Sequence, residues 1–192
     1  MNVIPLISVK KEALYEGRAQ DAAVLSLDIL FTRVEKDTML YVLDYDGIEH
    51  NNPNFELYQR LTEQCILWID NGPRRLDDVM DTIMAGATNI TLRKELWPDL
   101  DMPAIQELTD DEIYLDMSLY HQEHKTLHVP YLGDIGIVLF NEETMYGGFS
   151  KESASKQKIF LYTGSIEKNR FWDEQGLAGI IIDLQKKQGV KV

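Results

Sequence analysis

The chain has 192 residues, of which 44% are hydrophobic, and its formal net charge is −13. A chain of this length can bury one sizeable core, and its pattern indicates no second one, so we expect a single domain over residues 1–192. The acidic charge disfavours nucleic acids and anionic membranes as partners, because both repel a negative protein surface. A small anionic ligand stays compatible with this charge, because it needs only a few local cations.

Cysteine usage and hydropathy predict a cytoplasmic protein with no membrane partner. Cys65 is the only cysteine, so an intramolecular disulfide is excluded, as is typical of a reducing compartment. No apolar run approaches the roughly 20 residues of a membrane-spanning helix. The first five residues also lack the charged-then-apolar layout of a signal peptide.

Short apolar runs recur along the chain, separated by polar or amphipathic stretches. They are rich in Ile, Val, Leu and Tyr, which favour strands. The runs begin near Val3, Met39, Cys65, Asn89, Glu112, Ile135, Lys158 and Ala178. Nearly continuous apolar strands at such spacing are typical of a parallel sheet covered by crossover helices. The pattern predicts an α/β fold, a compact (β/α)8 TIM barrel.

The stretches between the first five runs carry the periodicity or capping residues of helices. Helices are predicted within residues 21–35, 54–64, 76–85 and 103–108. Later stretches are less helical, because residues 121–132 contain a proline and residues 145–156 are rich in Gly and Ser. Eight βα units commonly take about 250 residues. We therefore expect shortened or missing later helices and a homo-oligomer in which a second copy covers one flank.

Three segments of the first half resemble one family of barrel enzymes. Residues 4–10 read IPLISVK, residues 43–47 read LDYDG, and residues 72–79 read GPRRLDDV before AGA at 85–87. They are similar to the strand motifs IPAIDLK and VDLDG, and to GIRSLEDI followed by AGA, of the ProFAR isomerase family of histidine biosynthesis. Order and spacing agree over residues 1–95, and later matches are thinner. The resemblance implies a divergent member of that family, with archaeal relatives among the proteins it resembles.

In that family, one aspartate on the first strand and one on the fifth form the acid–base pair of an aldose-to-ketose rearrangement. The resemblance assigns the fifth-strand role to Asp116. Ser8 stands at the first-strand position, and a serine has neither the charge nor the pKa of that base. Asp44 and Asp46, two apart on the predicted second strand, should share a face and assist at the barrel mouth. Alternatively, these two carboxylates anchor the strand end and cap the following loop.

The family binds two substrate phosphates in glycine-rich turns, whose backbone N–H groups point at the oxygens. At the matching positions this chain keeps Gly72 and Gly164, but Ser165 replaces the second glycine of its pair. Asp183 and its neighbour replace a glycine-plus-basic pair, and a carboxylate there repels a phosphate by roughly 1 kcal/mol or more. A ligand with one phosphate or none is therefore expected.

Basic side chains follow the third and fourth predicted strands. Arg74, Arg93 and Lys94 are candidates for an anion pocket that replaces the lost glycines, and the alternative is solvated helix ends. His121, His124 and His128 follow the fifth strand, but without a helix their spacing is unspecific, so surface histidines are expected. No metal and no cofactor are predicted.

Three functions follow from these patterns. The leading one is a ProFAR isomerase-like enzyme that acts by acid–base chemistry on a small, phosphorylated metabolite at the C-terminal barrel face. The second is a non-catalytic descendant that binds a metabolite or a partner protein, with a link by analogy to one-carbon cofactor biosynthesis. The third is ProFAR isomerase activity itself, against which Ser8 argues.

Overall fold

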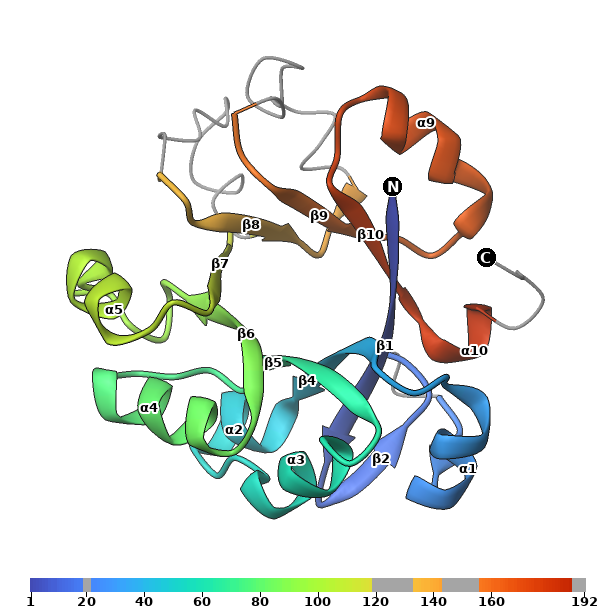
Figure 1. Ribbon diagram of the computed structural model, residues 1–192, viewed down its shortest axis with the longest axis horizontal. Helices are drawn as coiled ribbons and strands as arrows, with labels where there is room; N and C mark the ends of the chain where they lie inside the picture. The colour runs from blue at the N-terminus through green and yellow to red at the C-terminus, as the bar shows by residue number, and fades with distance from the viewer. Residues whose placement is uncertain (19–21, 119–132, 143–155, 188–192) are drawn as a thin grey trace.

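The protein is described by a computed structural model, which covers residues 1–18, 22–118, 133–142 and 156–187. Parallel strands form a closed barrel, and helices lie outside the ring of strands (Figure 1). The eight barrel strands are β1 (Asn2–Lys10), β4 (Thr38–Asp44), β5 (Cys65–Asp70), β6 (Ala87–Arg93), β7 (Glu112–Asp116), β8 (Gly136–Leu139), β9 (Ile159–Tyr162) and β10 (Gly179–Asp183). Each strand pairs in parallel with the next, and β10 pairs with β1 to close the ring. The predicted (β/α)8 barrel and its eight strands are confirmed.

The predicted helices form within or within one residue of their expected ranges. They are α1 (Leu27–Arg33), α3 (Phe55–Leu61), α4 (Leu76–Met84) and α5 (Met102–Leu108). The last crossover carries a 3-10 turn η1 (Ile166–Lys168) and α9 (Asn169–Glu174), and the chain continues after β10 into α10 (Leu184–Lys187). The two predicted loops at 121–132 and 145–156 lie, but for residue 156, outside the described residues.

Two features depart from the predicted pattern. An antiparallel hairpin of β2 (Ala13–Tyr15) and β3 (Val24–Leu25) extends the sheet from β1 and occupies part of the first predicted helix. Helix α2 (Tyr45–His50) begins directly after β4. The expectation that Asp44 and Asp46 share a strand face is therefore wrong. The Asp44 carboxylate accepts hydrogen bonds from the backbone N–H groups of Asp46 and Gly47, which caps a helix at that point.

The barrel interior is filled by buried side chains. Every second residue of a strand points inward, and the buried interior side chains are Ile4, Leu6, Tyr41, Leu43, Trp68, Tyr114, Val138, Phe140, Phe160 and Ile181. The Trp68 ring lies 4.0 Å from that of Tyr114 and 4.8 Å from that of Phe160, measured between centroids. Gly136 has no room for a Cβ atom beside the Tyr114 ring. A second apolar cluster packs between the strands and the helices.

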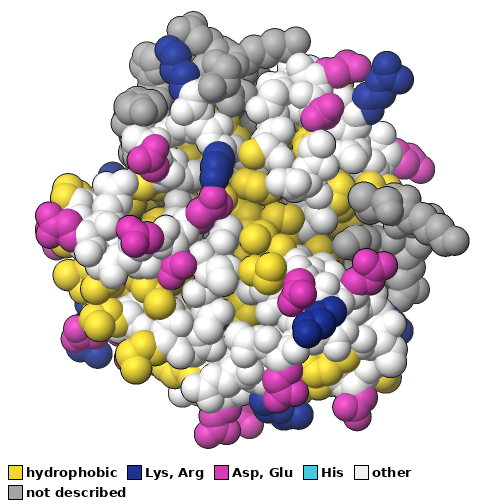
Figure 2. Space-filling view, in the orientation of Figure 1, with side chains coloured by type: hydrophobic (Ala, Val, Ile, Leu, Met, Phe, Trp, Pro, Cys, Tyr) yellow, Lys and Arg dark blue, Asp and Glu magenta, His cyan; other side chains and the backbone are white. Residues whose placement is uncertain are grey.

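On the face shown in Figure 2, apolar side chains gather toward the middle and charged side chains lie around them. Within the part of the chain that the structure describes, no helix is long and apolar enough to cross a membrane.

Candidate functional site

Polar side chains form a ring above the aromatic interior, at the C-terminal ends of the barrel strands. The ring consists of Ser8, Asp70, Arg93, Asp116, Tyr162 and Asp183, and each member follows an inward-pointing residue of its own strand by two positions. Barrel enzymes place their active sites at this end of the strands. We refer to this ring as the mouth.

Arg93 joins two carboxylates across three neighbouring strands of the mouth. Its Nε and Nη2 atoms donate to the two oxygens of Asp70 at 2.9 and 2.7 Å. Its Nη1 atom lies 2.9 Å from Oδ2 of Asp116. The three side chains are 16%, 0% and 4% exposed, in the order Arg93, Asp70 and Asp116. One guanidinium group therefore serves two buried carboxylates.

The layer below the mouth fixes the position of Asp70. The hydroxyl of Tyr41 donates to Oδ2 of Asp70 at 3.0 Å and lies 3.0 Å from the Thr91 hydroxyl. The indole N–H of Trp68 donates to the same Thr91 oxygen at 2.9 Å. Asp70 thus accepts a bidentate pair of hydrogen bonds from Arg93 and a further bond from Tyr41. These bonds fix its carboxylate in one position.

Asp116, the second carboxylate bound by Arg93, has a raised pKa. Burial raises the pKa of its carboxyl group, and the nearby negative charge of Asp70 adds to the rise. Arg93 and two hydrogen bonds from Ser118, at 2.5 Å from its hydroxyl and 2.9 Å from its backbone, oppose the rise without cancelling it. Because one cation cannot neutralise two buried carboxylates, Asp116 takes up a proton more readily than an ordinary aspartate. Such a group suits general acid–base catalysis.

Asp183, on the opposite side of the mouth, is saturated by donors from the protein itself. Its carboxylate accepts bonds from the Arg18 backbone at 2.8 Å and from the Tyr162 hydroxyl at 3.0 and 3.1 Å, and Lys186 lies 3.0 Å away. Burial and this carboxylate raise the pKa of Tyr162. Tyr162 therefore stays protonated and continues to donate.

Arg18 presents a cation at the mouth that forms no ion pair with a described carboxylate. Its guanidinium carbon lies 5.0 Å from the centroid of the Phe140 ring and 5.2 Å from that of Tyr162. One nitrogen donates to the Phe140 carbonyl at 3.1 Å, and among the described residues no carboxylate lies within 4.0 Å. The Arg93 guanidinium lies 5.6 Å from the same Phe140 centroid. A single ring therefore connects the free cation with the Arg93–Asp116 pair.

Ser8 occupies the mouth in the position where the resembled family has aspartate. Its side chain is buried, and its hydroxyl donates to the Gly17 carbonyl at 2.7 Å. Gly17 itself packs so closely on Asp183 that it has no room for a Cβ atom. Ser8 thus helps to fix the segment that delivers Arg18 to the mouth. Nothing in the sequence pattern had singled out Arg18, because it lies in the connection between the two short strands of the hairpin, β2 and β3.

Asp44 and Asp46 are engaged by backbone donors. Besides capping α2, Asp44 accepts from the Asn54 backbone at 2.9 Å and from the Tyr58 hydroxyl. Asp46 accepts from the backbone N–H groups of Lys11 at 2.7 Å and Glu12 at 3.0 Å. These contacts correspond to the alternative in which the two carboxylates anchor the strand end and cap the following segment.

The structure does not bring the three candidate cations together. Arg74 donates to the carbonyls of Gly47, Ile48 and Gly72 at 2.8–3.2 Å, next to the end of α2. Gly72 provides the turn there, with a φ of 68°. Arg93 points into the mouth, and Lys94 is exposed in the turn that follows β6.

The two candidates after β9 lie beside a small polar network. The Ser165 hydroxyl accepts from the Glu167 backbone at 3.2 Å and caps η1. Next to it, the Thr163 hydroxyl donates to Glu142 at 2.5 Å, and Glu142 pairs with Lys168 at 2.6 Å. A Cβ atom at Gly164 would lie 3.8 Å from the Lys186 ammonium group.

The three clustered histidines, His121, His124 and His128, lie outside the described residues. Among the residues that are described, no group of His, Cys, Asp and Glu side chains could hold a metal ion. Comparison with family models and with curated proteins gives no match to this chain.

Proposed function

We propose that the chain binds a small anionic metabolite at the mouth and carries out acid–base chemistry on it. In this proposal Arg18 holds the anion and Asp116 moves the proton. The observation that carries the proposal is the Phe140 ring shared by the two guanidinium groups, one free and one bound to Asp116. Charge-assisted bonds to a planar guanidinium suit carboxylates and phosphates.

The resemblance to ProFAR isomerases supports the role of Asp116, because its position matches their fifth-strand aspartate. Two departures argue for a different substrate. Ser8 is committed to the Gly17 carbonyl, and Asp183 places a buried carboxylate where the family binds phosphate. The proposed ligand therefore carries one phosphate or one carboxylate. A cytoplasmic location and a homo-oligomeric state belong to the same proposal.

Ribose 5-phosphate, a small phosphorylated aldose, is a suitable probe for the anion site. Calorimetric titration should give a dissociation constant that rises at least about tenfold in Arg18→Gln, because a charge-assisted bond contributes roughly 1.5–3 kcal/mol. Arg170→Gln is the matched control, since Arg170 is 92% exposed and pairs with Glu174 on α9. Equal affinities in the wild type and Arg18→Gln would refute this role of Arg18.

A non-catalytic metabolite-binding protein is the second candidate. It is favoured by the saturation of Asp70 and Asp183 with hydrogen-bond donors from the protein. Asp116→Asn separates the two functions. An enzyme loses turnover of its phosphorylated substrate while its affinity changes only a few-fold, whereas a binding protein shows no turnover in either form.

A further inference from the structure

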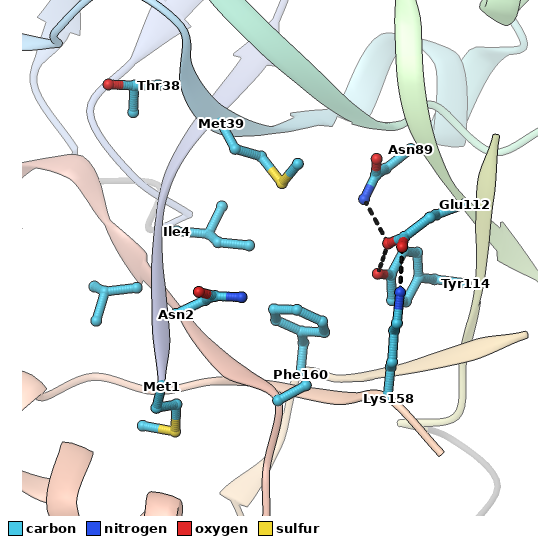
Figure 3. A pocket seen from close by; sticks show the side chains of 12 residues that line it. Met1, Asn2, Ile4, Thr38, Met39, Asn89, Glu112, Tyr114, Lys158 and Phe160 are labelled. Atoms are coloured by element: carbon cyan, nitrogen blue, oxygen red, sulfur yellow. Dashed lines mark hydrogen bonds and ion pairs between the residues drawn. The ribbon is translucent and has the colours of Figure 1, made fainter.

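A pocket opens at the end of the barrel opposite the mouth, where the strands begin. It has a volume of about 580 Å³, within the range of about 300–1,000 Å³ that small-molecule sites occupy. Residues of β1, β4, β6, β7 and β9 line it (Figure 3). We call it the lower pocket.

The wall of the lower pocket toward the barrel interior is apolar and aromatic. Ile4, Met39, Tyr114 and Phe160 contribute it. The Phe160 ring packs against Gly179, where a Cβ atom would overlap the ring. The rings of Phe160 and Tyr114 stand edge to face, 5.6 Å apart between centroids. Thioether and aromatic surfaces of this kind favour a flat, ring-containing ligand.

The charged side chains of the lower pocket neutralise each other. Glu112 pairs with Lys158 and accepts from the Tyr114 hydroxyl at 2.5 Å and from the Asn89 amide at 3.5 Å (Figure 3). Partial burial raises the pKa of Glu112, but the hydrogen bonds from Lys158 and Tyr114 outweigh it and leave the pKa below its ordinary value. The carboxylate is thus ionised and already matched by an ammonium group, so these two side chains offer a charged ligand no unmatched counter-charge. The N-terminal ammonium group of Met1, which also lines the pocket, pairs with Asp173 at 3.7 Å.

The Asn2 carboxamide is a further polar group in the lining of the pocket. Its side chain extends toward the Phe160 ring in Figure 3, and it forms no side-chain hydrogen bond with the described residues. A carboxamide offers two N–H donors and one carbonyl acceptor side by side. Its natural partner is a ligand with the same adjacent pair of donor and acceptor.

We propose that the lower pocket binds an uncharged, ring-containing small molecule that carries an amide-like donor–acceptor group. The ring packs on Phe160, Tyr114 and Met39, and the amide-like group pairs with Asn2. This site is independent of the proposed function, because the mouth lies at the other end of the strands.

Three probes with one phenyl ring separate charge from shape: benzamide is neutral, benzoate is an anion and benzamidine is a cation. Protein-observed NMR titration should show benzamide shifting the amide signals of β1 and β9 near Asn2 and Phe160. Its affinity should exceed that of benzoate and of benzamidine at least about fivefold, a difference of roughly 1 kcal/mol. Equal binding of all three, binding of none, or shifts confined to the mouth would overturn the proposal.

One variant with its control tests the location, and another tests the polar recognition. Thr38→Trp should fill the rim of the pocket and weaken benzamide at least about tenfold. Met84→Trp, at a position on α4 that is 77% exposed, is the control and should stay within twofold. Asn2→Leu tests the donor–acceptor group without filling the pocket, and it should remove the preference for benzamide over benzoate. Unchanged benzamide affinity in folded Thr38→Trp, or an unchanged preference in Asn2→Leu, would refute the assignment.

Discussion

Arg93 and Asp70 form a bidentate ion pair across β5 and β6, with nitrogen–oxygen distances of 2.9 and 2.7 Å, at a depth where Asp70 is fully buried. The same guanidinium group reaches Asp116 on β7. This pairing couples the stability of the barrel to the chemistry of its mouth, because each carboxylate depends on the same cation.

Loss of the Arg93 guanidinium group should lower the free energy of unfolding. Arg93→Met leaves Asp70 and Asp116 buried without a counter-charge, and loss of one partner of a buried pair costs about 3–5 kcal/mol. Urea unfolding at neutral pH measures the loss. Arg75→Met is the control, because Arg75 is 70% exposed and its surface pair with Asp78 should contribute little to the stability. Similar losses in both variants would show that the buried triad does not differ from a surface pair.

Asp116 should titrate above the ordinary aspartate range. Its pKa is raised by burial and by Asp70, so folding favours the protonated form. The stability from this group is fully present below its unfolded pKa of about 3.9, and it is lost as the pH rises through the folded value. Carboxyl ¹³C NMR should show a raised pKa for Asp116, as it should for Asp44, whose pKa burial also raises, and only the Asp116 signal should disappear in Asp116→Asn. Disappearance of a signal that titrates below pH 4 would contradict the assignment.

Asp46, in contrast to Asp116, should have a pKa below the ordinary aspartate value. Partial burial raises the pKa of its carboxyl group, but bonds from the Glu12 and Lys11 backbone prevail and lower it. Asp46→Ala should destabilise the protein by roughly 1–3 kcal/mol at neutral pH. The depressed pKa means that the difference from wild type shrinks as the pH falls through the folded value, below about 4.

Asp28→Ala is the control for that measurement, since Asp28 is exposed in the first turn of α1. It should change the stability by less than about 0.5 kcal/mol. A loss for Asp46→Ala that stays constant from pH 7 to pH 3 would show that its carboxylate does not hold the β1–β2 turn as an anion.

Gly136 is a glycine on which the packing of the barrel interior depends. Gly136→Ala should overlap the Tyr114 ring and force the packed aromatic side chains apart, at a cost of about 1–3 kcal/mol. Gly164→Ala is matched in chemistry and has its nearest neighbour, the Lys186 nitrogen, at 3.8 Å. Thermal unfolding should distinguish the two variants. Equal melting temperatures would show that the interior adapts to the added methyl group.

The barrel was predictable because each strand is buried and leaves a run of apolar residues in the sequence. The run of β10, with Gly179 followed by isoleucines and Asp183, illustrates this. Helix α2 was not predictable by apolar periodicity, because it is a six-residue helix that depends on the Asp44 cap. The hairpin β2–β3 was missed for a similar reason, since its strands have only three and two residues.

Site residues at the ends of strands could be predicted from the sequence, whereas site residues in loops and turns were harder to predict. Side chains alternate between the two faces of a strand, and Asp116 and Arg93 stand at the ends of their strands on the inward face. Their position in the mouth could therefore be predicted from the sequence. Arg74 has the same residue type as Arg93, but its neighbours are the carbonyls of α2, a helix that the pattern did not reveal. Arg18 reaches the mouth through the backbone contact with Asp183, which is distant in sequence, and local patterns carry no signal of such a contact.

A crystal structure of the protein with ribose 5-phosphate tests the central proposal most directly. The account predicts that the phosphate lies within hydrogen-bonding distance of the Arg18 guanidinium, beside Phe140 and Tyr162, with the sugar directed toward Asp116. A phosphate bound in the turn of Gly72 and Arg74 instead, with Arg18 making no contact to the ligand, would contradict it.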